Sequence, residues 1–122
     1  MKTVAVLGAS SDHNKFGNKA VRTFRDCGYR VYPINAKESV VEGIEAFPSL
    51  QFVPARADIV SVYLPPPVLL SLLPGLAAVG IVELWLNPGT DTPEVIAALE
   101  RLNIPFLQAC SLVRLGVNPS DY

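Results

Sequence analysis

The sequence has few charged residues, and their scarcity excludes several classes of protein. Only 17% of its 122 residues are Asp, Glu, Lys or Arg, whereas 50% are hydrophobic. A disordered chain has the opposite composition, so this chain is expected to fold around a hydrophobic core. Its length predicts one domain over residues 1–122. An isoelectric point near 5.7 argues against a nucleic-acid partner.

Cysteine and histidine are also scarce. The two cysteines, Cys27 and Cys110, lack the spacing of a metal site and are expected to be reduced thiols. The single histidine, His13, lies in a polar stretch, where a solvated side chain is more common than a general base. No base is evident that would activate Ser10, Ser11 or Cys110 as a nucleophile. A binding role is therefore expected rather than an enzymatic one.

The longest stretch without charge runs from Ile59 to Val82 and is 24 residues long, which is enough to cross a bilayer. Its prolines argue against a membrane span, because each removes a backbone donor that hydrocarbon cannot replace. These prolines are Pro65, Pro66, Pro67 and Pro74. The stretch is expected to form a strand, a helix from Val68 to Val79 and a second strand. Because the chain begins Met-Lys and lacks a signal-peptide hydrophobic region, a cytoplasmic location is expected.

Five strand patterns alternate with three helix patterns along the chain. Strands are expected at 3–7, 29–34, 57–64, 81–86 and 105–109, and helices at 16–27, 68–79 and 93–102. Nearly continuous apolar runs such as Val4 to Leu7 are typical of parallel strands that are covered on both faces. We therefore predict an α/β fold, a doubly wound, five-stranded parallel sheet with helices on both faces. Residues 36–56 and 111–122 carry no clear pattern.

Ligands of doubly wound sheets bind beyond the carboxyl ends of the strands, so the loops at 8–15, 64–67 and 87–89 are expected to form the site. Residues 1–40 hold seven cations and three acids, whereas residues 41–122 hold three cations and eight acids. An anionic ligand would therefore be attracted to the first third of the chain. Gly8 and Ala9 allow close backbone approach, and Lys15 adds a cation beside a helix N-terminus. This combination suits a phosphate, although a tight turn without a ligand is the alternative.

Several common nucleotide-binding and hydrolase motifs are absent. The first loop has no G-x-G-x-x-G, and Asn35 stands where an NAD site would place an acid. No phosphate-loop motif or G-x-S-x-G elbow occurs, and the third strand ends in Tyr63-Leu64-Pro65 rather than in the acid of a receiver domain. A binder of NAD(P) or another nucleotide on the same fold stays open as an alternative.

Five motifs occur in order and together point to one family. They are Val4 to Ser10 with Lys15 and Gly17, Gly28 to Asn35 with the pattern G-Y-x-V-Y-P-x-N, Gly43 with Pro48-Ser49-Leu50, Ala57 to Tyr63 with Pro65-Pro66, and Trp85 to Gly89. From about residue 3 to 110 the chain resembles the CoA-binding domain family, small Rossmann-like proteins akin to the N-terminal domain of the succinyl-CoA synthetase α subunit.

The resemblance implies that coenzyme A or an acyl-CoA lies across the strand ends. The matching positions are Gly8, Ala9, Ser10 and Lys15 for the phosphates, Asn35 near the adenosine, Tyr63, Pro65 and Pro66 for the groove, and Asn87, Pro88 and Gly89 for the pantetheine arm. Family members commonly have Gln in place of Asn87 and often have Asp-Arg-Cys where this sequence has Gln108-Ala109-Cys110. A mixed disulfide between Cys110 and the CoA thiol is a hypothesis; a buried, inert cysteine is the alternative.

The function that the resemblance implies is non-catalytic binding of CoA or acyl-CoA, as a regulator or carrier. The synthetase relatives use a phosphorylated histidine in an additional domain, so a subunit of a CoA-ligase-type enzyme is an alternative. The helix from Val68 to Val79 leaves almost no polar face. Because a helix that is apolar all round is normally buried, a homo-oligomer or a partner protein is expected at this helix.

Overall fold

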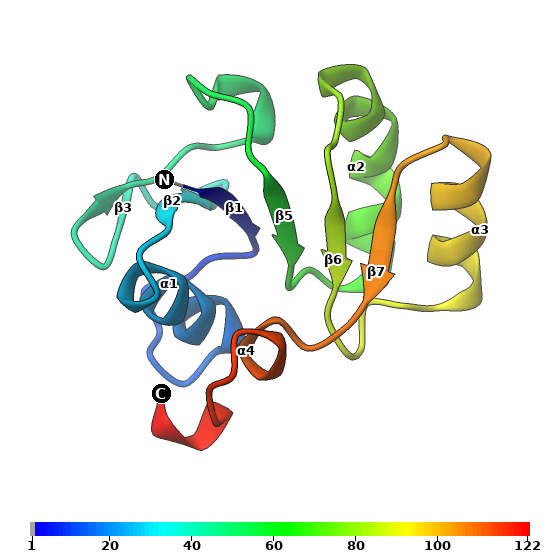
Figure 1. The fold of residues 1–122 in the computed structure, drawn as a ribbon. Helices are drawn as coiled ribbons and strands as arrows, with labels where there is room; N and C mark the ends of the chain where they lie inside the picture. Colours follow the sequence, from blue (N-terminus) through cyan, green and yellow to red (C-terminus); the bar gives the residue numbers. More distant parts are fainter. Residues whose placement is uncertain (1) are drawn as a thin grey trace.

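The computed structural model describes residues 2–122, and its centre is a five-stranded sheet (Figure 1). The strands are β1 (Thr3–Leu7), β2 (Arg30–Ile34), β5 (Ile59–Val62), β6 (Leu84–Leu86) and β7 (Phe106–Gln108), in the order β2-β1-β5-β6-β7. All four pairings between neighbouring strands are parallel. The predicted doubly wound sheet is therefore confirmed, and its strand order reverses between β1 and β5.

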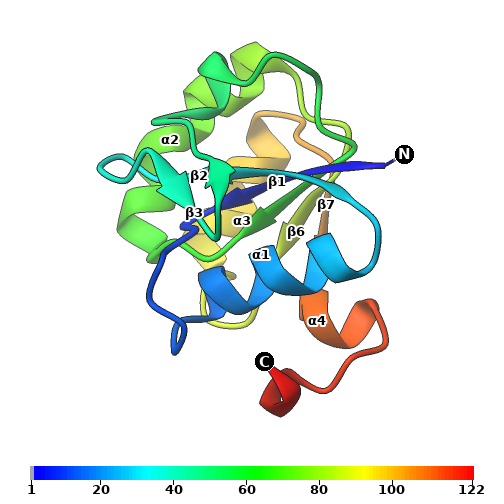
Figure 2. The ribbon, with the colours of Figure 1, turned by 90° about the vertical axis from the view of Figure 1, so that its left-hand side faces the viewer.

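Helices cover both faces of the sheet, as expected. Helix α1 (Phe16–Asp26) and the short α4 (Ser111–Arg114) lie on one face, and α2 (Pro66–Val79) and α3 (Pro93–Arg101) lie on the other. In Figure 2, α1 and α4 lie below the sheet and α2 lies above it. The strands are apolar throughout because successive side chains serve opposite layers. In β1, Val4 and Val6 pack on the α1 side, whereas Ala5 and Leu7 pack on the α2 side.

The segment that carried no clear sequence pattern forms small local elements. Strands β3 (Val40–Val41) and β4 (Ile44–Glu45) form a hairpin, followed by a 3-10 turn, η1 (Leu50–Phe52). The hairpin turn has positive φ at both central residues, 51° at Glu42 and 73° at Gly43, which is the geometry that matches the twist of a two-residue hairpin. A second 3-10 turn, η2 (Pro119–Asp121), ends the described chain.

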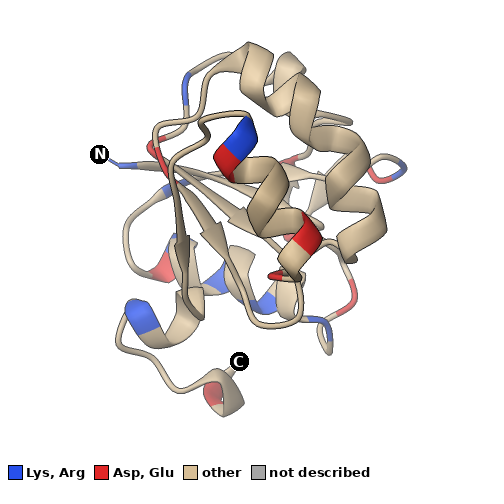
Figure 3. Ribbon diagram, turned by 90° about the vertical axis from the view of Figure 1, so that its right-hand side faces the viewer, with Lys and Arg blue, Asp and Glu red and all other residues tan. Residues whose placement is uncertain are grey.

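Helix α2 begins at Pro66, two residues before the expected start, because a proline in the first turn of a helix needs no N–H partner. Its buried residues are Leu69, Leu73 and Leu76, so one apolar stripe packs on the sheet. The other side of α2 faces solvent, although all 14 residues of the helix are uncharged (Figure 3). Within residues 2–122, no helix is long and apolar enough to span a membrane.

Strand β6 is shorter than the expected 81–86, because it pairs with β7 over only three residues, from Leu84 opposite Phe106 to Leu86 opposite Gln108. Residues 81–83 instead form the turn between α2 and the sheet. This turn and the end of α2 lie at the opposite edge of the sheet from the predicted ligand site.

Candidate functional site

A cavity of about 590 Å³ opens at the carboxyl ends of β1, β2, β5 and β6. Its lining residues are Gly8, Ala9, Ser10, Asn14, Lys15, Phe16, Gly17, Asn35, Tyr63, Leu64, Pro65, Pro88, Gly89 and Thr90. The cavity lies where the strand order reverses, which is the position at which doubly wound sheets bind ligands. The sequence predicted eleven contacts with CoA and a thiol, Cys110, near the ligand. Nine of these twelve residues line the cavity, whereas Pro66, Asn87 and Cys110 do not.

The loop after β1 is held by two contacts between backbone atoms. A Cβ atom on Gly8 would lie 2.7 Å from the carbonyl oxygen of Tyr63, and Gly8 has a φ of +87°. A Cβ atom on Gly17 would overlap the carbonyl oxygen of Gly8. Only glycine fits at either position, because the first turn of α1 packs directly on the loop. The N-terminus of α1 is thereby placed at the wall of the cavity.

This helix N-terminus is open to an anion. Lys15 is the N-cap residue of α1, no side chain caps the helix, and the first turn contains no acid. The first backbone N–H groups of a helix lack intrahelical partners and carry a partial positive charge. Lys15 itself is exposed and lines the cavity. The N-terminal residues of α1 and Lys15 thus line the same cavity, and backbone N–H groups beside an ammonium group are an arrangement that suits phosphate.

Asn35 lines the cavity, but its amide is fully engaged by the protein. The Nδ2 group donates to the carbonyl oxygen of Ala9 at 2.8 Å and to the Glu38 carboxylate at 3.2 Å. The Oδ1 atom accepts from the N–H groups of Lys37 and Glu38 at 2.7 and 2.8 Å. Asn35 therefore connects the loop after β2 to the loop after β1, and any contact with a ligand adds to that role.

Glu38 is a residue that the sequence analysis missed. Its carboxylate accepts hydrogen bonds from the hydroxyl and the N–H group of Ser11, and these bonds lower its pKa below the usual range. It is the first acid after β2, yet it lies outside the cavity lining and turns toward Ser11. The only sequence signal was an Asn three residues before it, which is a pattern for a local turn.

The groove wall on the β5 side is formed by Tyr63, Leu64 and Pro65. The Tyr63 hydroxyl is buried, and the loss of hydration raises its pKa to about 12. The side chain therefore stays neutral at physiological pH and contributes shape rather than charge. Pro66 follows as the first residue of α2 and lies just outside the cavity lining.

Asn87 is only 2% exposed, and its side chain points into the protein. Its Nδ2 group donates to the carbonyl oxygen of Val62 at 2.9 Å and to the Ser61 hydroxyl at 3.1 Å, while Oδ1 accepts from the Ser111 N–H at 2.7 Å. The two serine hydroxyls are themselves hydrogen-bonded at 2.8 Å. Asn87 thus ties the ends of β5 and β6 to the start of α4, and the cavity surface of its loop is supplied by its neighbours Pro88, Gly89 and Thr90.

Cys110 is half-buried at the N-terminal end of α4 and packs against the apolar cluster on the α1 face. It is not among the cavity-lining residues. Its reaction with a CoA thiol stays a prediction. Within residues 2–122, no cluster of His, Cys, Asp and Glu is arranged to hold a metal ion.

Together, the parallel sheet, its strand order and the helices on both faces define a Rossmann-like α/β domain. The chain belongs to the CoA binding domain family, whose sequence profile matches residues 2–116. This match confirms the resemblance drawn from the five motifs.

Curated relatives include two ADP-forming acetate–CoA ligases. The chain is 33% identical over 63 residues to the α subunit of ligase II of Pyrococcus furiosus, a match that covers 51% of this chain and 14% of the relative. It is 33% identical over 64 residues to ligase I of Archaeoglobus fulgidus, covering 52% of this chain and 9% of the relative. The matches therefore span only a small part of each ligase.

Two solved structures are similar over nearly their whole length. A conserved hypothetical protein of Pyrococcus furiosus superposes with a TM-score of 0.87 at 26% identity, over 93% of this chain and 99% of that one. A Thermus thermophilus protein described as cell-free ID.343 superposes with a TM-score of 0.84 at 34% identity, over 94% of this chain and 87% of that one. These structures confirm the fold over most of the chain.

The hydrogen bonds of Asn87 predict its contribution to stability. Asn87→Leu removes two donors and one acceptor from a buried site and leaves the Ser111 N–H without a partner, so we expect a loss of about 3 kcal/mol in the free energy of unfolding, measured with urea. Asn14→Leu, in the exposed first loop, is the matched control and should change stability by less than about 0.5 kcal/mol. Equal losses in the two variants would contradict a structural role for Asn87.

The placement of Cys110 makes the mixed-disulfide hypothesis testable. If the thiol reaches the ligand, incubation with CoA disulfide should add one CoA to the intact mass of the protein, and Cys110→Ser should abolish the adduct. Cys27→Ser is the control, because Cys27 is exposed at the far end of α1. An adduct that persists in Cys110→Ser, or no adduct on the unmodified sequence, would disprove the hypothesis.

Proposed function

We propose that this domain binds coenzyme A or an acyl-CoA in the cavity at the carboxyl ends of β1, β5 and β6, without chemistry of its own, as a regulator or carrier. The observation that carries the proposal is the uncapped N-terminus of α1, which opens on the cavity beside Lys15. CoA carries its negative charge on phosphates, which suit backbone N–H groups and an ammonium group. Membership of the CoA binding domain family supports the same ligand.

The rest of the cavity suits the uncharged arm of CoA. Opposite the helix N-terminus, the walls are Leu64 and Pro65 on one loop and Pro88 and Gly89 on the next. These residues offer apolar surface and backbone polar groups, and none carries a charge. A volume of about 590 Å³ falls within the usual range for small-molecule sites.

The side chains around the cavity do not form a catalytic group. His13 is exposed, and its Nε2 atom lies 2.8 Å from the Glu42 carboxylate, away from the cavity lining. The Ser11 hydroxyl is bonded to Glu38, whose lowered pKa makes it a weak base. A role as a part of a CoA ligase is the second candidate function, favoured by the similarity to the two acetate–CoA ligases. In that case chemistry would come from other domains or subunits.

An NAD(P) site is disfavoured by the position of Glu38. In dinucleotide-binding domains an acid near the end of the second strand accepts hydrogen bonds from the ribose hydroxyls. Here the first acid after β2, Glu38, accepts hydrogen bonds from Ser11 and lies outside the cavity lining.

Ligand-dependent melting temperatures test the proposed ligand. A ligand at a hundred times its dissociation constant stabilises the folded state by about 2.7 kcal/mol, which is on the order of 10 °C for a domain of this size. We expect CoA, acetyl-CoA or succinyl-CoA to raise the melting temperature more than NAD, NADP or ATP. A shift with NAD or ATP and none with any CoA species would contradict the proposal.

Two lysine variants locate the phosphate contact. Lys15→Ala should weaken CoA binding about tenfold and roughly halve the thermal shift, because it removes a charge-assisted hydrogen bond. Lys19→Ala is the matched control, since Lys19 lies one turn further along α1 and outside the cavity lining. The same loss of shift in both variants would indicate a general effect of charge rather than a contact with Lys15.

We further propose that the exposed side of α2 is an interface with a second copy of the chain. Val68 and Leu72 are 45% and 40% exposed there, and the helix has no charge that would need a partner of opposite sign (Figure 3). Light scattering at tens of micromolar should give at least twice the monomer mass of 13.2 kDa. Leu72→Lys should restore the monomer, whereas Val113→Lys, which replaces an exposed valine of α4, should not. A monomer for the unmodified chain would refute the interface.

A further inference from the structure

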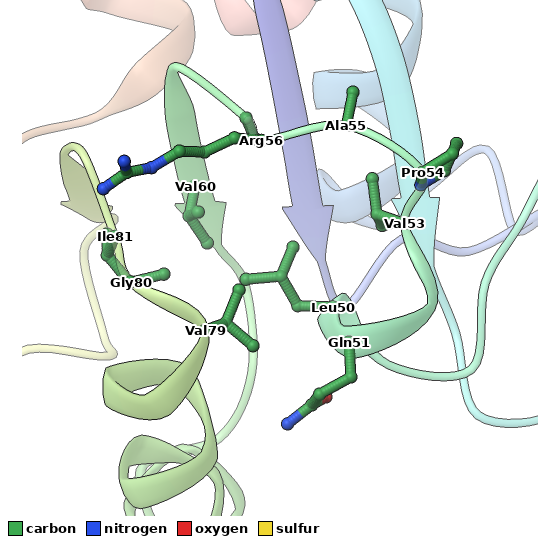
Figure 4. Close-up of a pocket in the computed structure, with 11 residues that line it drawn as sticks. Leu50, Gln51, Val53, Pro54, Ala55, Arg56, Val60, Val79, Gly80 and Ile81 are labelled. Carbon is green, nitrogen blue, oxygen red and sulfur yellow. The ribbon is translucent and has the colours of Figure 1, made fainter.

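A second cavity, of about 610 Å³, lies at the edge of the sheet opposite the proposed CoA site (Figure 4). It is enclosed by the segment from η1 to the start of β5 on one side and by the end of α2 on the other. Val60, near the start of β5, lines the cavity between them. None of the residues from 2 to 122 lines both cavities, so a ligand here would not share contacts with CoA.

Most of the lining of this second cavity is apolar. Side chains of Leu50 and Val53 from the η1 segment face Val79 and Ile81 from the α2 end across the space (Figure 4). Burying an aliphatic chain among such side chains is favourable in proportion to the area removed from water. The lining therefore suits a ligand with an aliphatic body.

One positively charged side chain, that of Arg56, also lines this cavity. The Arg56 side chain extends across the cavity toward Gly80 and Ile81 (Figure 4). A Cβ atom on Gly80 would lie 3.5 Å from Nη2 of Arg56, so the glycine leaves room for the guanidinium group. Because α2 has no basic residue in its last turn, Arg56 also offsets the negative end of that helix.

Two acids, Asp58 and Glu83, could be expected to pair with Arg56, but both accept hydrogen bonds from other residues. Asp58 accepts from the N–H and the hydroxyl of Thr3 at 2.9 and 3.1 Å, and Glu83 accepts from the Trp85 indole at 2.7 Å. Within residues 2–122, the Arg56 guanidinium group forms no ion pair within 4.0 Å. Its planar set of N–H donors is therefore free to bind a carboxylate through two parallel hydrogen bonds, in the bidentate geometry.

We propose that this second cavity is a binding site for a small aliphatic monocarboxylate. The carboxylate bonds to the Arg56 guanidinium group, and the chain packs against Val53 and Val79, the two branched aliphatic side chains of the lining that are still accessible. Neither part alone makes the site: the cation without the apolar walls is a solvated arginine, and the walls without the cation offer no preference for an acid.

The probe for this site is hexanoate, with hexanol as the uncharged analogue, followed by amide chemical shifts in an NMR titration. We expect hexanoate to shift the amides of residues 50–57 and 79–81 with a dissociation constant on the order of a millimolar, as small ligands of this size bind. Hexanol should bind at least tenfold more weakly, because it lacks the charge that pairs with Arg56. Along a series from butyrate to octanoate, affinity should rise about fourfold per methylene group at most.

Three variants separate the site from general effects. Arg56→Gln should reduce hexanoate affinity to that of hexanol, and Arg56→Lys should fall between, because it keeps the charge but not the paired donors. Arg101→Gln, which removes an exposed charge at the end of α3, should leave hexanoate binding unchanged. The thermal shift of Arg56→Gln with CoA should match that of the unmodified chain, which shows that the fold and the other site are intact.

The proposal is overturned by any of three results. One is equal binding of hexanoate and hexanol, which would mean that Arg56 does not recognise the acid. Another is a set of shifted amides at residues 8–17 and 88–90, which would place hexanoate in the first cavity. The third is the absence of any shift at ten times the expected dissociation constant.

Discussion

The packing of backbone on backbone at Gly8 and Gly17 is the constraint on which the candidate site depends. Gly17 in the first turn of α1 lies against the carbonyl of Gly8, and Gly8 lies against the carbonyl of Tyr63 at the end of β5. Three chain segments therefore meet without any side chain between them. This contact brings the N-terminus of α1 to the point where the strand order reverses, so the positive end of the helix and the carboxyl ends of the strands face one space.

Hydrogen bonds from side chains hold the remaining loops around that contact. Asn35 and Glu38 connect the loop after β2 to Ala9 and Ser11 in the first loop. Asn87 connects the ends of β5 and β6 to Ser111 of α4. The polar side chains nearest the cavity thus divide into those that shape it and those, such as Lys15, that are free to contact a ligand. A site shaped this way is largely formed before the ligand arrives, which reduces the cost of ordering the loops on binding.

The two edges of the sheet differ in chemistry. At the carboxyl edge, backbone N–H groups and Lys15 suit a phosphate, whereas at the other edge a single guanidinium group stands among apolar side chains. The difference follows from the direction of the helices, since α1 begins at the first edge and α2 ends at the second. The exposed side of α2 runs between these two edges. It carries no charge and is therefore a third, apolar surface.

The fold could be read from local patterns, such as the apolar run from Val4 to Leu7 and the helix boundaries. Nine of the cavity-lining residues followed from the small residues before α1 together with the resemblance to the CoA-binding domain family. The roles of Asn87 and Glu38 could not, because their partners are 24 and 27 residues away along the chain. The hairpin at 40–45 also escaped detection, since two-residue strands are too short for a pattern. Arg56 and Ile81 likewise meet only when β5 and β6 pair. Periodicity and composition dictate which elements form, whereas contacts between distant segments decide which side chains face a cavity, because those contacts exist only once the sheet has assembled.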